Sequence, residues 1–196
     1  MKRLLALIAA FLLTTALCAC NSTGNTTDPT PKPTGLSSVP SQIEVMREGE
    51  VSNIDVETVN GVIGNYAIAM DPTYFVFQVL DDMDYFWYEA WGEDTPVYYS
   101  VRPYEGTYDP ARFISEVKTN HADRYASCTS EETVIAALNA TVVRLSSCTA
   151  APDFNRVVIL LNSGEQLYVL ETEFTTEMAE GLYPIIMASL NTFTVK

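Results

Sequence analysis

A break in composition near Cys20 limits how much of this chain can fold. Two cations and the apolar run Leu4–Leu13 precede it. The run is shorter than the roughly 20 residues that a membrane-spanning helix needs, so we interpret it as part of a signal for export. The stretch Asn21–Pro40 is rich in Thr, Ser, Pro, Asn and Gly. It cannot bury enough apolar surface to offset its chain entropy, so we expect a disordered tether over 20–40 and one folded domain over 41–196.

The residues at this break, Leu17, Cys18, Ala19 and Cys20, resemble the bacterial lipobox. The lipobox places a small residue before the cysteine that receives the lipid. Ala19 fills that place for Cys20, whereas Cys18 would follow Leu17. The resemblance implies a signal peptide over 1–19 and a lipid on Cys20, with the domain facing outside the cytoplasm at the cell membrane or outer membrane. The alternative is an ordinary secreted protein that is cleaved near Ala19.

The charge of the chain narrows the choice of partners. It has 25 acidic and 11 basic residues, and loss of the two basic residues of the signal leaves a net charge of −16. So acidic a surface repels nucleic acid and does not dock electrostatically on anionic lipid. The simplest role of the charge is solubility, and the alternative is attraction of a cationic partner or a metal.

Hydrophobic patterns predict mostly strands with two helical segments. The segment 109–125 has apolar residues at helical spacing, with Asp109 as a cap and Pro110 in the first position. The segment 175–193 is also helical in period, capped by Thr175 or Thr176, and Pro184 should kink or split it. Strands are expected over 51–59, 65–70, 74–80, 84–91, 96–104, 156–162 and 165–174, the last two joined by a turn at Ser163 and Gly164.

The segment 127–149 fits two structures. Thr129 and Glu132 would make a capping box for a helix. A hairpin with a three-residue turn centred on Leu138 explains more, because it pairs Cys128 with Cys148. Directly opposed strand residues lie within the range that a disulfide tolerates, so we favour the hairpin and predict a structural disulfide in an exported protein. A redox-active pair is the alternative, but the Cys-x-x-Cys spacing is missing.

The order of elements indicates an α+β domain, in which one antiparallel sheet of about six to eight strands packs against two main helices. Several stretches resemble the PsbP/DcrB-like group of domains: "GNYAIAMDPTYFVF", "DPARFISEVKTNHADRY", "VVILLNSGEQLYVLETEF" and "YPIIMASLNTF". The resemblance covers roughly Val51 to Lys196 and implies an accessory or binding role rather than an enzyme. It transfers no functional residue, since these are patterns of fold.

The sequence contains few residues that suggest chemistry. The single histidine, His121, lies on the apolar stripe of a predicted helix, and no Gly-x-Ser-x-Gly turn accompanies it. No metal signature and no phosphate loop are present, so we expect no cofactor. Asp81, Asp82 and Asp84 bear oxygen ligands suited to Ca²⁺, but their spacing fits no EF-hand.

The stretch from Asp81 to Asp94 is the remaining candidate. Tyr85, Trp87 and Trp91 are expected on one face of a strand, with Phe86 and Tyr88 on the other. An exposed aromatic face would bind a glycan or a peptide, and the alternative is a core strand that is covered on both sides.

Three functions follow from these features. The first is a non-enzymatic, lipid-anchored module that binds an envelope protein. The second is a carbohydrate- or peptide-binding domain that uses the aromatic strand, and the third is a hydrolase with an unrecognised site.

Overall fold

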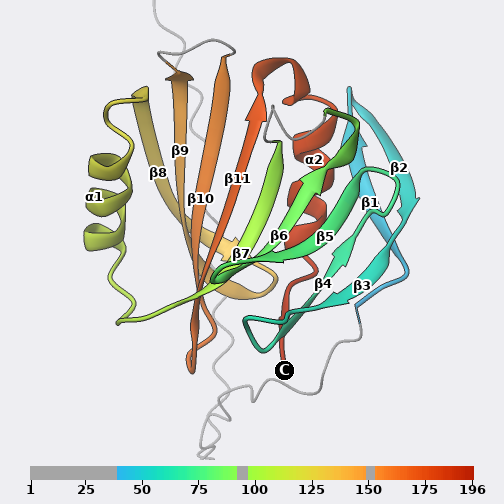
Figure 1. The fold of residues 1–196 in the computed structure, drawn as a ribbon, viewed down its shortest axis with the longest axis horizontal. Coiled ribbons are helices and arrows are strands. Elements are labelled where there is room, and N and C mark those ends of the chain that lie inside the picture. Colours follow the sequence, from blue (N-terminus) through green and yellow to red (C-terminus); the bar gives the residue numbers. More distant parts are fainter. Residues whose placement is uncertain (1–38, 92–96, 149–152) are drawn as a thin grey trace, which may run out of the picture. The chain divides into compact units, whose positions relative to one another are not determined.

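The computed structural model describes residues 39–91, 97–148 and 153–196, all within one compact unit. These ranges form strands joined by two α-helices and two short 3-10 helices (Figure 1). In chain order the elements are β1 (Gln42–Arg47), β2 (Glu50–Asp55), β3 (Glu57–Asn60), β4 (Tyr66–Met70), β5 (Phe75–Leu80), β6 (Met83–Tyr88), η1 (Glu89–Trp91), β7 (Tyr98–Tyr104), α1 (Pro110–Asn120), β8 (Tyr125–Ile135), β9 (Leu138–Cys148), β10 (Phe154–Asn162), β11 (Leu167–Thr175), η2 (Thr176–Met178), α2 (Leu182–Leu190) and β12 (Thr194–Val195).

A seven-stranded antiparallel sheet forms the centre of the fold. Its strand order is β5-β6-β7-β11-β10-β9-β8. Four strands lie between the two α-helices along the chain, as the sequence predicts. The antiparallel sheet with two helices confirms the α+β class.

The prediction of a single sheet was wrong, because two smaller sheets accompany the central one. Strands β3, β4 and β12 form one, and β1 and β2 form the other. The expected strand 51–59 breaks at Val56, which is buried and whose N–H donates to the carbonyl of Ser41. This break lets β2 and β3 belong to different sheets.

Alternate residues of the central sheet enter two separate cores. The larger core contains Phe86 of β6 and Ile186 of α2. The smaller core joins Phe113 of α1 to Val143 and Leu160 of the sheet. Because neighbouring residues of a strand point to opposite faces, we distinguish an α2 face and an α1 face of the sheet.

Strands β8 and β9 form the predicted hairpin in a different register. Ile135 pairs with Leu138, which leaves a two-residue turn at Ala136 and Ala137. Both alanines have positive φ, 52° and 62°, as a type I′ turn requires. The predicted three-residue turn centred on Leu138 was therefore wrong. Alanine rarely adopts this backbone conformation, so the sequence carried no signal for the turn.

The N-terminal part of the first predicted helix is confirmed. The Asp109 side chain accepts from the N–H of Arg112, and Pro110 is the first helical residue. The helix ends at Asn120, and Tyr125 begins β8 instead of ending the helix. The predicted range was too long at its C-terminal end.

The second predicted helical segment is split, as expected for a proline-containing helix, but the break lies before the proline. Pro184 falls in the first turn of α2, where its missing N–H removes no intrahelical hydrogen bond. Thr175 precedes η2 without a side-chain cap hydrogen bond, so its capping role is not confirmed. Within the described ranges, no helix is long and apolar enough to cross a membrane.

Candidate functional site

The α1 face of the central sheet is covered over only part of its width. Helix α1 contacts β8, β9 and β10, and no described helix lies in front of β5, β6 and β7 (Figure 1). The side chains that strand pairing places on this uncovered part include Val76, Gln78, Tyr85, Trp87 and Tyr98. We call these five residues the aromatic surface.

Strand β6 separates two sets of rings by simple alternation. Phe86 points to the α2 face, where it is fully buried and stacks on Tyr99 with centroids 4.3 Å apart. Tyr85 and Trp87 point the other way and are only partly buried. The rings of Tyr85 and Tyr98 lie 4.8 Å apart between centroids. The prediction that Tyr85 and Trp87 share a strand face is confirmed.

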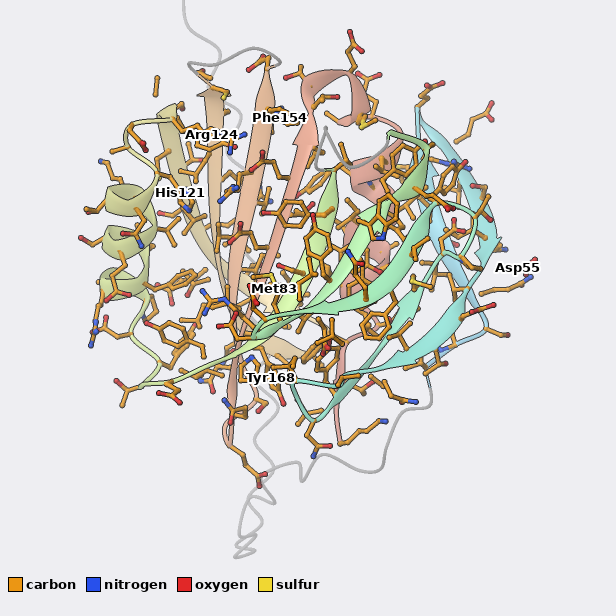
Figure 2. All side chains as sticks on the ribbon, viewed as in Figure 1. Asp55, Met83, His121, Arg124, Phe154 and Tyr168 are labelled. Carbon is orange, nitrogen blue, oxygen red and sulfur yellow. The ribbon has the colours of Figure 1, made fainter. Side chains whose placement is uncertain are left out.

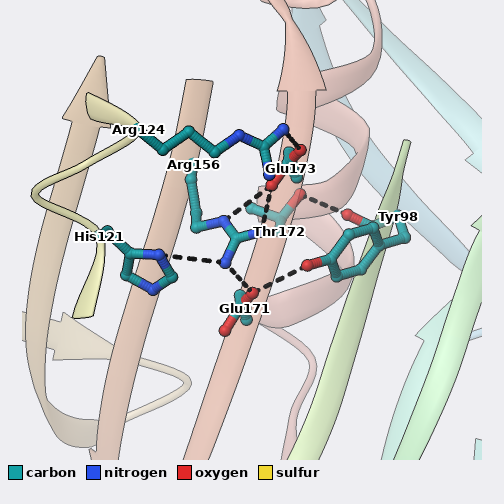
Figure 3. Close-up of polar contacts among 7 residues, drawn as sticks. All are labelled: Tyr98, His121, Arg124, Arg156, Glu171, Thr172 and Glu173. Carbon is teal, nitrogen blue, oxygen red and sulfur yellow. Dashed lines mark hydrogen bonds and ion pairs between the residues drawn. The ribbon is translucent and has the colours of Figure 1, made fainter. Parts of the chain in front are cut away.

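A group of charged side chains borders the aromatic surface. Tyr98 pairs with Glu173 of β11, and Glu173 pairs with Arg156 of β10, so one row of the sheet runs from a ring to an ion pair. We call Arg124, Arg156, Glu171 and Glu173 the arginine–glutamate cluster (Figure 3).

Glu173 is the buried centre of this cluster, with a side chain that is 1% exposed. Arg124 Nη2 donates to its Oε1 at 2.6 Å. Arg156 donates to Oε2 through Nε at 2.8 Å and also through Nη2. Burying a carboxylate is costly unless it is paired and hydrogen-bonded, and here two guanidinium groups provide both.

Arg124 reaches the cluster from the turn between α1 and β8. Its guanidinium carbon lies 5.5 Å from the ring centroids of both Tyr125 and Phe154. Figure 2 shows Arg124 and Phe154 at the same end of the sheet, with His121 below Arg124 near α1. The rings help to orient the guanidinium toward Glu173, because a cation is attracted to an aromatic face.

Glu171 is the member of the cluster nearest the aromatic surface, and it keeps acceptor capacity. Its Oε1 accepts from the Tyr98 hydroxyl at 2.8 Å and from Arg156 Nη1 at 2.9 Å. No described residue donates to its Oε2, which carries no dashed line in Figure 3. The side chain is 22% exposed, so this oxygen is available to an approaching group.

The cluster changes the acidity of the groups around it. Burial, and then the charge of Glu171, raise the pKa of Tyr98. Burial, followed by Glu173 and Glu171, raises the pKa of Tyr85 to about 12. Burial lowers the pKa of Arg156, but Tyr98, Glu171 and Glu173 raise it more, so the net shift is upward. The two phenols stay neutral and the guanidinium stays charged at neutral pH.

His121 follows the last residue of α1, in the C-cap position, and faces the cluster. Its Nδ1 lies 3.5 Å from Arg156 Nη1, and its ring meets the ring of Tyr125 edge to face. Burial, and then the charge of Arg156, lower the pKa of His121. A histidine beside a cation is not the histidine–hydroxyl–carboxylate arrangement that the hydrolase hypothesis requires.

Two predicted site residues do not join the aromatic surface. Strand β6 ends at Tyr88, so the placement of Trp91 on the same strand face was wrong, and this residue ends η1 instead. The side chain of Trp91 lies outside the described part of the structure. Cys20 also lies outside it, so its lipidation stays a prediction.

The cysteines of the β8–β9 hairpin are not opposite each other. Cys128 pairs with Leu145, and Cys148 pairs with Tyr125. The register that supported a disulfide was therefore wrong, and the structure contains no bond between the two sulfurs. Both cysteines are half-buried beside the smaller core. The disulfide remains a prediction without the geometry that suggested it.

The aspartates of the β5–β6 hairpin are dispersed. Asp84 is buried on the α2 face, where it accepts from the Tyr66 hydroxyl at 2.7 Å and from backbone N–H groups of 62–63. Asp81 and Asp82 are exposed. Among the residues that the structure describes, no group of three or more His, Cys, Asp or Glu is placed to hold a metal ion.

Sequence reasoning missed the arginine–glutamate cluster. The signal that could have found it is the pattern of Glu171 and Glu173 at alternate positions of a strand that is largely hydrophobic, with Arg156 on the hairpin partner. Only the register of β10 against β11 shows that Arg156 opposes Glu173.

Comparison with known proteins identifies the fold. No family model matches the chain, and no curated protein matches it in sequence. In structure it is similar to a cyanobacterial PsbP (CyanoP) from Synechocystis sp. PCC 6803, with a TM-score of 0.53 and 10% sequence identity. The match covers 72% of this chain and 92% of that chain. At this identity the likeness shows a PsbP-like fold alone, which confirms the resemblance in fold.

Proposed function

We propose that this chain is an exported lipoprotein, anchored through Cys20, whose PsbP-like domain is a non-enzymatic binding module for a protein of the cell envelope. The observation that carries the proposal is the aromatic surface. Tyr85, Trp87 and Tyr98 lie side by side on a sheet face that no described helix covers. Tyrosine and tryptophan are enriched in protein interfaces, where they bury a large apolar area around one polar atom.

The surroundings make this surface suitable for binding. Tyr98 is held by its hydrogen bond to Glu171, and Glu171 is held by Arg156. The back of β6 is fixed by the stack of Phe86 on Tyr99. A surface whose side chains are already fixed loses little conformational entropy on binding.

A photo-crosslinking amino acid at Gln78 tests the proposed surface in producing cells. Gln78 is exposed and lies on the aromatic surface, paired with Tyr85. The matched control is Val134 of β8, which is 63% exposed at the far edge of the same sheet. We expect a discrete protein adduct from position 78 and none from position 134. Identical adduct patterns from the two positions would contradict the proposal.

The two cysteines of the lipobox provide a paired test of the anchor. In the Cys20→Ala variant the protein should leave the membrane fraction, since the lipid acceptor is lost. In the Cys18→Ala variant it should stay in that fraction. The reverse result would assign the lipid to Cys18 and contradict the proposed anchor.

A glycan is the second candidate ligand of the same surface. The specific observation in its favour is that Tyr85 and Trp87 are both partly exposed, with the polar side chains of Gln78 and Glu171 beside them. Stacking on a ring with hydrogen bonds at its edge is one way to bind a sugar. Chitohexaose binding by the full chain that is lost in Trp87→Ala, together with no protein adduct from Gln78, would favour this candidate over the first.

A further inference from the structure

The charges around the aromatic surface are strongly unbalanced. The segment Asp71–Tyr104, which forms β5, β6 and β7, contains seven acidic residues and one basic residue, Arg102. Asp71 and Asp84 are buried, and Glu93 and Asp94 lie outside the described residues. Asp81 and Asp82 are exposed at one end of the β5–β6 hairpin, and Glu89 is exposed at the other. The rings therefore lie between acidic ends in a chain whose net charge is −14.

The aromatic surface itself also favours positive charge. Glu171, which accepts from Tyr98, has a second oxygen without a described donor, and its side chain is 22% exposed. Burial raises the pKa of Tyr85 to about 12, and the charges of Glu173 and Glu171 contribute in the same direction. The faces of tyrosine and tryptophan rings attract cations.

We infer that the aromatic surface binds a basic segment of a polypeptide. Its Lys or Arg side chains lie over the rings of Tyr85 and Trp87 and pair with Glu171. The exposed carboxylates at the two ends of the β5–β6 hairpin attract neighbouring basic residues of the same segment. This inference rests on the proposed binding function and names the chemistry of the partner.

Charge complementarity distinguishes this partner from other occupants. A second copy of the chain would bring two acidic surfaces together, which costs free energy. An anionic partner would meet the same repulsion. A neutral glycan would stack on the rings, but its binding would not depend on salt.

Binding of labelled decapeptides to the full chain in detergent tests the inference by fluorescence anisotropy. The probes are deca-arginine, deca-lysine, deca-glutamate and a neutral Gly-Ser decapeptide. We expect binding of the two basic peptides only, with affinity that falls as salt rises from 50 to 200 mM. Trp87→Ala should weaken the binding of deca-arginine about tenfold.

Charge variants distinguish the effect of carboxylates near the aromatic surface from the effect of the overall negative charge of the chain. The double variant Asp82→Asn, Glu89→Gln should weaken binding several-fold, because it removes two exposed carboxylates at the ends of the β5–β6 hairpin. The double variant Glu131→Gln, Glu132→Gln removes the same charge from exposed positions of β8 and should change the affinity less than twofold. Because all four positions are exposed, urea unfolding should show that these variants fold normally. Equal losses in the two double variants would overturn the inference.

Competition in the photo-crosslinking experiment distinguishes the two proposals. Excess deca-arginine added to membranes should abolish the adduct from Gln78. An adduct that persists in excess deca-arginine overturns the basic-partner inference and leaves the proposed binding function standing. Loss of the adduct with deca-arginine but not with deca-glutamate supports both.

Discussion

On the α1 face of the central sheet, Leu160 of β10 is fully buried, whereas Leu80 of β5 is 42% exposed. Both leucines lie on the same face of one sheet. Helix α1 packs on β8, β9 and β10, and no described helix covers β5, β6 and β7. The composition matches this difference. Under α1 the sheet presents mainly Val and Leu, whereas the open part presents Tyr, Trp and Gln, whose polar atoms tolerate water, beside the exposed Val76 and Leu80. The comparison indicates that the side chains of the open part are suited to partial contact with water.

The arginine–glutamate cluster lies at the boundary between these two regions. His121 and Arg124 reach it from the C-terminal end of α1, and Tyr98 reaches it from the aromatic surface. The cluster lies next to the smaller core, which includes Tyr125 beside Arg124. A buried charge is stable only while its partner is present, so removing one member of the arginine–glutamate cluster should lower the free energy of unfolding.

The largest expected loss of stability distinguishes the two faces of β6. Phe86→Ala should lower the free energy of unfolding by about 4 kcal/mol, because it leaves a cavity in the core beneath the sheet. Tyr85→Ala, one residue away, should cost much less, because its ring is only partly buried. Urea unfolding of both variants measures the difference. Similar losses would mean that Tyr85 is a core residue and would remove the contrast between the faces.

The next largest loss of stability tests the arginine–glutamate cluster between the covered and open parts of the sheet. Arg156→Ala should cost about 3 kcal/mol, since it leaves the buried carboxylate of Glu173 with one of its two guanidinium partners. Arg112→Ala breaks the exposed pair with Glu116 on α1 and should leave the unfolding midpoint unchanged. If both variants keep the midpoint of the unsubstituted protein, the buried pairing does not stabilise the fold.

A matched pair of leucine truncations compares the covered and open parts directly. Leu160→Ala should cost about 2–3 kcal/mol, and Leu80→Ala should cost less than about 0.5 kcal/mol. The same residue type and the same sheet face make exposure the main variable. An equal cost at the two positions would show that β5 is covered in solution.

The smallest expected effect is a pH dependence of stability that arises from His121, beside the arginine–glutamate cluster. Burial and the nearby charge of Arg156 lower the pKa of His121 in the folded state. The contribution of His121 is therefore fully present above its unfolded pKa of about 6.5 and is lost as the pH falls below that value toward the folded pKa. Glu171, Glu173 and Asp123 also act on this group, so the comparison must be with His121→Gln.

Urea midpoints at pH 7.5 and pH 5.5 provide that comparison. The unsubstituted protein should lose more stability between the two values than His121→Gln does. Equal losses would show that His121 titrates alike in the folded and unfolded states.

Local patterns made much of the fold predictable. Alternation and helical period depend on residues a few positions apart, so the order of elements and the start of α1 at Asp109 were readable. The shared face of Tyr85 and Trp87 followed from the same rule. The acidic charge of the β5–β7 segment is a property of the sequence itself.

The tertiary structure alone decided register, coverage and charge pairing. The turn at Ala136 and Ala137 shifts β8 against β9, and a shift of register changes every cross-strand partner, including those of the cysteines. The exposure of Trp87 depends on where α1 packs, and the pairing of Arg156 with Glu173 depends on the β10–β11 register. These features join residues far apart in the chain, so they follow from loop geometry and packing across the sheet rather than from any local pattern.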